Sequence, residues 1–264
     1  MQKKNVLMMT MSLAMVGVVA VGGTLAYLTS NTKTMTNTFT VGSGYAENAL
    51  KLDETAMPSA QVNPTEISTN SRTENGVGND YAPMYPGSQI AKDPTLYLKK
   101  GSPVSYVFAK VENVDTLLSV KAHVDEEEVC AFIVSDKEAG TVVNEDTSKL
   151  STTWKKIADV GTDGNPEYAA DGKGFVITSE KLDGFYCLAA NDGVVTVPTG
   201  AEDYSSLAPL FKSVTLRSDL TTMPSQSETS IGNIAVTGYA IQKDNLDTSA
   251  AALMALFPNT STNE

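Results

Sequence analysis

The run from Val104 to Val111 is apolar on both faces when it is read as a β-strand. Side chains alternate between the two faces of a strand, and here both sets are apolar: Tyr106 and Phe108 on one face, Val107 and Ala109 on the other. Only a strand covered on both sides buries both faces. We therefore expect this strand at the centre of the fold.

Further short runs have strand composition and are bounded by Gly, Asp, Asn or Pro. We expect strands at residues 95–98, 129–134, 175–178, 185–189, 194–197, 213–216 and 234–241. Many short strands with frequent turns and few helices are typical of an all-β protein. The prediction is an antiparallel jelly-roll-like β-sandwich with one or two short helices.

The clearest helix signal lies near the end of the chain, in DTSAAALMALFP. Asp247 or Thr248 can cap the first exposed N–H groups, and Pro258 ends the helix. A second short helix is expected over Leu207–Phe211.

The N-terminus is typical of a secretory signal peptide, predicted over residues 1–26. A basic start is followed by the apolar run Val6–Val21, which is shorter than a membrane-spanning helix requires. Thr24 and Ala26 occupy the small-residue positions, so cleavage is expected between Ala26 and Tyr27. The mature chain is therefore expected to be secreted, without a stable membrane span.

Residues 27–42 form a Thr-rich, strand-like stretch that contains Tyr27, Leu28, Phe39 and Val41. Its residue types suit a paired β-strand. The rest, residues 43–264, is expected to be one β-sandwich domain. Residues 43–82 are polar and predicted to be mainly a surface excursion, with at most one or two short strands around residues 50–52.

Composition excludes some functions and leaves others open. The 264 residues carry a formal net charge of −12, which argues against nucleic acid as a partner. Cys130 and Cys187 are equally consistent with one disulfide in an oxidising compartment and with two buried, unpaired thiols.

The chain has no recognisable catalytic constellation. The single histidine, His123, stands beside the acidic run Asp125–Glu128 without the second histidine of a zinc motif. The loop at residues 159–174 lacks the closing Glu of a helix-flanked calcium site. No nucleophile elbow or phosphate loop is present, and Trp154 is interpreted as a core anchor. We expect no catalytic residue, metal site or cofactor.

Several segments of the chain together match a known pattern. They begin with Gly22–Ala26 and the NTFTVG stretch, Asn37–Gly42. They continue in three blocks that cover most of the mature chain: Tyr85–Asn113, Gly184–Leu216 and Ile234–Phe257. In their order and joint presence these segments resemble the TasA/camelysin family of secreted Gram-positive bacterial proteins.

The resemblance implies a jelly-roll sandwich, export through a SipW-type signal peptidase, and a role in the biofilm matrix. Members of the family assemble head to tail into fibres, in which the N-terminal strand of one subunit completes the sheet of the next. Camelysin-type relatives are described as metalloproteases, but this sequence offers no zinc ligands to which that activity could be assigned.

The leading hypothesis is a secreted, non-enzymatic structural protein that forms extracellular or surface fibres by N-terminal strand donation. Its partners would be copies of itself, the signal peptidase during export, and other matrix proteins. One alternative is a monomeric accessory or anchoring domain of the matrix, and another is a camelysin-like metalloprotease.

Overall fold

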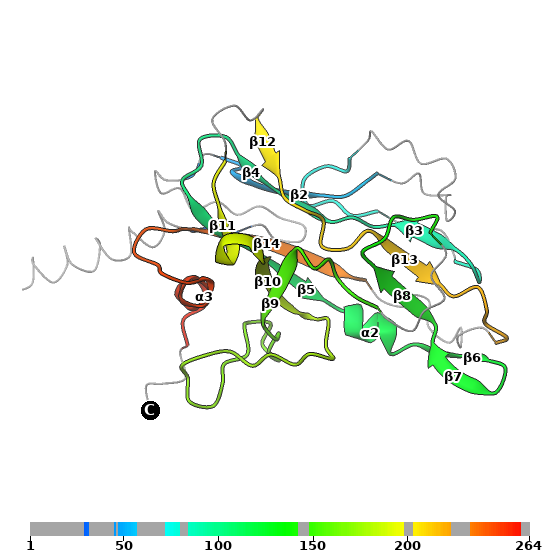
Figure 1. The fold of residues 1–264 in the computed structure, drawn as a ribbon. Coiled ribbons are helices and arrows are strands. Elements are labelled where there is room, and N and C mark those ends of the chain that lie inside the picture. Colours follow the sequence, from blue (N-terminus) through cyan, green and yellow to red (C-terminus); the bar gives the residue numbers. More distant parts are fainter. Residues whose placement is uncertain are drawn as a thin grey trace, which may run out of the picture.

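Antiparallel β-sheets make up most of the part of the chain that the structure describes (Figure 1). The computed structural model describes residues 29–31, 45, 47–56, 72–79, 84–141, 148–197, 203–222 and 233–259. Within these ranges the α-helices are α2, Val114–Leu118, and α3, Ser249–Leu256. The predicted all-β class is confirmed, and the jelly-roll connection pattern stays a prediction.

The main sheet has six strands, with the order β1-β14-β5-β10-β9 and β11 paired to β5. All its pairings are antiparallel. Its strands are β1 (Thr29–Asn31), β5 (Ser105–Glu112), β9 (Trp154–Ala158), β10 (Gly184–Leu188), β11 (Val194–Val195) and β14 (Ala235–Gln242).

Two three-stranded sheets share a hydrophobic core with one face of the main sheet. The β4 sheet consists of β12 (Tyr204–Ser206), β4 (Thr95–Lys99) and β2 (Leu50–Asp53). The β13 sheet consists of β3 (Gln89–Ala91), β13 (Ser213–Leu216) and β8 (Phe132–Ser135). A separate hairpin, β6 (Lys121–Val124) and β7 (Glu127–Cys130), projects at one end of the molecule (Figure 1).

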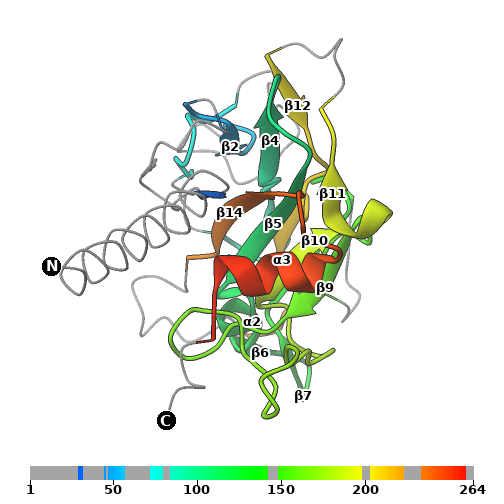
Figure 2. The same cartoon turned by 90° about the vertical axis from the view of Figure 1, so that its left-hand side faces the viewer.

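Strand β5 lies inside the molecule with both faces covered, as its sequence predicts. Val107 and Ala109 belong to the core shared with the two smaller sheets. Tyr106 and Phe108 face the opposite way and pack in a second cluster with Leu253 of α3. Figure 2 shows α3 lying across that face of the main sheet. The sandwich therefore has a third, helical layer on part of one side.

Most predicted strands are present, with shifts of a residue or so at their ends. The run predicted at residues 129–134 is interrupted at Ala131 and becomes the end of β7 and most of β8. The strand predicted at 175–178 is wrong, because only a single bridge, Phe175 to Tyr168, forms there. Strand β2 lies where the polar stretch was expected to hold a short strand.

Of the two helix predictions, the one near the end of the chain is confirmed and the other is wrong. Thr248 caps α3 by accepting a hydrogen bond from Ala251 N at 3.1 Å, and α3 ends before Pro258. The helix predicted over Leu207–Phe211 is wrong. Leu207 N instead donates to Leu96 O, and the side chain of Phe211 is fully buried, so this stretch is irregular chain that packs into the core.

Candidate functional site

The N-terminal residues named by sequence reasoning lie outside the described residues. This applies to the predicted cleavage site and to the side chains predicted for the donor strand: Thr24, Ala26, Tyr27, Leu28, Phe39 and Val41. Their roles stay predictions. The backbone of residues 29–31, within the same predicted segment, is described as β1.

Strand β1 forms one end of the main sheet by pairing with β14. Thr29 lies opposite Ile241, Ser30 opposite Ala240, and Asn31 opposite Tyr239. On its other side, β14 pairs with β5 along its whole length. In Figure 2 the short dark-blue β1 lies beside β14.

The alternation of hydrogen bonds identifies which of these pairs is bonded. Lys243 N donates to Val104 O, which continues the ladder between β14 and β5. Hydrogen-bonded and non-bonded pairs alternate along an antiparallel ladder. Odd-numbered residues of β14 therefore direct their backbone groups toward β5, and even-numbered residues toward β1. Ser30 and Ala240 are thus the bonded pair.

A different arrangement closes the outer edge of β2. Residues 72–79, which we call the clasp segment, supply the partners for backbone groups of Leu52 and Glu54. Gly76 N donates to Leu52 O at 2.8 Å, and Leu52 N donates to Oδ1 of Asn75 at 3.0 Å. Thr73 bonds Glu54 through both its backbone N–H and its hydroxyl. Side-chain oxygens thus replace part of a neighbouring strand.

Arg72 fixes the clasp segment to two acidic residues. Its Nε donates to Oδ1 of Asp53 at 2.8 Å, and its Nη1 donates to Oδ2 of Asp93. Asp53 is only 3% exposed, and its other oxygen lies 2.6 Å from Nζ of Lys51. Burial acts to lower the pKa of Arg72, but Asp93 and Asp53 outweigh it and raise that pKa. The guanidinium is therefore held in its charged form.

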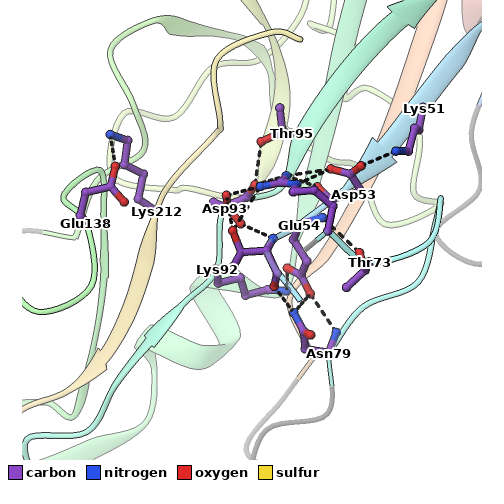
Figure 3. Close-up of polar contacts among 12 residues, drawn as sticks. Lys51, Asp53, Glu54, Thr73, Asn79, Lys92, Asp93, Thr95, Glu138 and Lys212 are labelled. Atoms are coloured by element: carbon purple, nitrogen blue, oxygen red, sulfur yellow. Dashed lines mark hydrogen bonds and ion pairs between the residues drawn. The ribbon is translucent and has the colours of Figure 1, made fainter. Parts of the chain in front are cut away.

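Glu54 makes a second group of contacts in this cluster (Figure 3). Its Oε2 accepts a hydrogen bond from Nζ of Lys92 at 2.8 Å. Its Oε1 accepts from the backbone N and from Nδ2 of Asn79, both at 2.9 Å. Glu54 is 4% exposed. We call Lys51, Asp53, Glu54, Arg72, Asn79, Lys92 and Asp93 the charged cluster.

Tyr97 on β4 borders the charged cluster. Burial, followed by the nearby charge of Asp53, raises its pKa to about 12. Lys51 lies 5.2 Å from the centroid of its ring. The phenol is therefore neutral at physiological pH, and its ring lies within cation–π distance of the Lys51 ammonium.

Both cysteines are free in the structure. Cys187 is buried on β10, and burial is the main cause that raises the pKa of its thiol. Cys130 is half-buried on β7, with Nζ of Lys121 3.1 Å from its sulfur. The choice between a disulfide and two buried, unpaired thiols stays open, and in the structure only Cys187 is buried.

The residues considered for metal binding lie in two places, the β6–β7 hairpin, where His123 is opposite Glu128, and the 159–174 loop. His123 is exposed on β6, and its backbone N–H bonds the hydroxyl of Thr222. In the 159–174 loop, Asp159 is instead neutralised by Lys156 at 2.5 Å and accepts from Thr178 N. No group of three or more His, Cys, Asp or Glu residues in the described ranges could hold a metal ion.

Trp154 is a core anchor, as interpreted from the sequence. It is 5% exposed on β9, and its indole Nε1 donates to Ala208 O at 2.8 Å.

Sequence reasoning missed the charged cluster because its members come from three separate segments. One signal was available in the sequence. Asp53 and Glu54 stand directly after the apolar residues of β2, and residues at the end of a buried strand are themselves buried. Nothing local to Arg72, Asn79 or Lys92 identifies their partners.

Comparison with known protein families, with curated proteins and with solved structures finds no match to this chain. The resemblance to the TasA/camelysin family therefore stays a prediction from the residues quoted above. Among the described residues, no helix has the length and apolar character needed to cross a membrane.

Proposed function

We propose that this chain is a secreted, non-enzymatic structural protein that assembles head to tail into extracellular fibres. In the fibre, the N-terminal strand of one copy takes the place of β1 on the next copy. The observation that carries this proposal is the short antiparallel pairing of β1 with the end strand β14.

The pairing of β1 is suited to exchange because it depends on backbone groups. A strand from another copy satisfies the N–H and C=O groups of Ala240 as well as the chain's own Ser30 does. The donating and accepting surfaces differ, so the contact between copies is heterologous and can propagate. The same strand closes the sheet within one chain and joins successive chains in a fibre.

The energy of the described contact is small. A bonded antiparallel pair makes two backbone hydrogen bonds, worth about 1–3 kcal/mol net in total. Ordering the three residues of β1 costs about 3–6 kcal/mol of backbone entropy. The described part of β1 thus contributes little to holding the strand in place.

Deletion of residues 27–40 tests the proposal. The truncated mature protein should stay a soluble monomer in size-exclusion chromatography and form no fibres by negative-stain electron microscopy, under conditions in which the intact chain polymerises. Fibres from the truncated protein would falsify strand donation.

A second test fixes β1 to its own chain. Asn31 and Tyr239 lie opposite one another as a non-bonded pair, and in such a pair the Cα atoms are about 4.5 Å apart, a distance that a disulfide can span. The double variant Asn31→Cys/Tyr239→Cys should remain monomeric when oxidised and polymerise after reduction. Equal assembly in both states would contradict exchange of β1.

The same contact favours one alternative, a monomeric accessory or anchoring domain of the matrix. Strand β1 already closes β14 within a single chain, so the monomer is a self-contained unit. Persistence of a monomer at high protein concentration, with intact residues 27–40, would support this alternative over the fibre subunit.

A further inference from the structure

The carboxylate of Glu54 holds a lysine and an asparagine side chain on its two oxygens. Nζ of Lys92 donates to Oε2 at 2.8 Å, and Nδ2 of Asn79 donates to Oε1 at 2.9 Å. Figure 3 shows both side chains directed toward Glu54. Glu54 follows directly after β2, Asn79 belongs to the clasp segment, and Lys92 follows directly after β3, so the fold itself brings the three together.

This arrangement is largely shielded from water and held by additional contacts. Glu54 is 4% exposed, and the side chain of Lys92 is 14% exposed. Asn79 is fixed twice more, because its backbone N donates to Oε1 and its Nδ2 also donates to Thr55 O at 2.9 Å.

We propose that Lys92 and Asn79 become joined by an intramolecular isopeptide bond, with Glu54 as the group that transfers the protons. The inference does not rest on the proposed function. It assigns to the charged cluster a covalent modification that the chain carries out on itself.

The chemistry uses only the groups present. Glu54 takes a proton from the Lys92 ammonium, and the freed amine attacks Cγ of Asn79. Glu54 then returns the proton to the amide nitrogen, which leaves with the second amine proton as ammonium. One carbon–nitrogen bond forms and one breaks, the carboxylate is regenerated, and nothing is oxidised or reduced.

The fold supplies what an unactivated amide needs in order to react. Positioning an amine beside an amide replaces a bimolecular encounter by an intramolecular one. Each nitrogen already shares a hydrogen bond with the same carboxylate, so one group serves as base and then as acid. Exclusion of water disfavours the competing hydrolysis of the amide.

Peptide mapping of the intact, folded protein tests the proposal. Trypsin normally cuts after Lys92 and gives a peptide of residues 73–92. An acylated Lys92 resists trypsin, so we expect a peptide of residues 73–99 that is lighter by one ammonia. After a further cut at Tyr81 by chymotrypsin, the fragments 73–81 and 82–99 should remain joined.

Two results would overturn the proposal. One is a peptide 73–92 of unmodified mass from the folded protein after prolonged incubation. The other is loss of ammonia with fragments that separate after the cut at Tyr81, which indicates a succinimide at Asn75 or Asn79 rather than a cross-link. Protein kept in urea from synthesis onward should lack the bond and acquire it on refolding.

Substitutions assign the roles. Asn79→Ala and Lys92→Arg should abolish the joined peptide, and Glu54→Gln should reduce it at least tenfold at equal incubation time. Lys212→Arg is the matched control, because Lys212 pairs with exposed Glu138 at 2.7 Å outside the charged cluster. An undiminished cross-link in Glu54→Gln would exclude Glu54 as the proton-transfer group. Because the mapping of the unaltered protein stands alone, a variant that fails to fold leaves the test intact.

Discussion

The outer edge of β14 is closed by backbone, whereas the outer edge of β2 is closed by backbone bonds together with side chains and charges. At β14, the three residues of β1 supply the ladder. At β2, the clasp segment uses Thr73, Asn75 and Arg72. A backbone ladder accepts any strand of suitable length, while a set of side-chain contacts accepts one sequence. The first edge is thus suited to exchange between copies and the second to permanent closure.

The largest expected effect comes from breaking the closure at β2. Arg72→Met removes a charged partner from buried Asp53 and should lower the free energy of unfolding by about 3 kcal/mol. Urea unfolding followed by circular dichroism measures this. A loss below about 1 kcal/mol would mean that Lys51 alone neutralises Asp53, and that Arg72 adds little beyond a surface ion pair.

The buried ion pair between Asp159 and Lys156 tests whether stabilisation by buried charges is lost in acid. Burial acts to raise the pKa of Asp159, but hydrogen bonds from Lys156 and Thr178 outweigh it and lower that pKa below the ordinary 3.8. A lowered carboxyl pKa stabilises the fold above the ordinary value, and this contribution is lost as the pH falls through the folded value.

Asp159→Asn should therefore lower the free energy of unfolding by about 2–3 kcal/mol at neutral pH. The loss should be smaller than for Arg72→Met, because Lys156 keeps its hydrogen bonds to two backbone carbonyls. The difference in free energy of unfolding between the unaltered protein and the variant, here called the gap, should stay constant down to about pH 4 and narrow below it. Urea titrations at several pH values measure the gap. A gap that widens in acid would show that the sign of the pKa shift is wrong.

The edge at β14 should respond in the opposite manner, with a small effect on stability and a large one on assembly. Ser30→Pro removes the N–H that bonds Ala240, and should change the free energy of unfolding by less than about 1 kcal/mol. Polymerisation, followed by light scattering, should be lost. Thr29→Ala and Asn31→Ala are the controls, since they keep the backbone donors and should still assemble.

The smallest effect is expected where an ion pair closes neither edge. Lys212 and Glu138 are 34% and 74% exposed in their side chains. Lys212→Gln should change the free energy of unfolding by no more than about 0.5 kcal/mol. A loss as large as that of Arg72→Met would show that the measurement does not distinguish buried from exposed charges.

The strands of the core could be predicted from the sequence because their signal is local. Alternating apolar residues identify both faces of β5, and its position between two clusters follows from that pattern alone. Thr248 and Pro258 likewise mark the ends of α3 by local rules of helix capping.

The errors arise where a local signal was given too little weight or where tertiary contacts decide the structure. In Leu207–Phe211, Pro209 disfavours helical backbone at the residue before it, and Leu210 and Phe211 are fully buried in the core. The run ending at residue 134 breaks at Ala131, where the backbone N–H of Ala131 bonds Val120 O. Edge strands such as β3 and β12 are only three residues long and carry too little pattern to detect.

The charged cluster could not be predicted, because the contact between Glu54 and Lys92 joins residues 38 positions apart. The polarity of residues 43–82 predicts a segment that lies mainly at the surface. It does not reveal that Asp53 and Glu54 are buried while Lys51 and Arg72 lie at their rim.

The single tryptophan gives this molecule a built-in optical probe. Trp154 lies on β9, at the opposite end of the main sheet from β1, in an apolar site with its indole N–H bonded. Its fluorescence should shift to longer wavelength when the sandwich unfolds and stay unchanged when only β1 departs. Emission spectra can thus separate loss of the fold from exchange of a strand in one unlabelled sample.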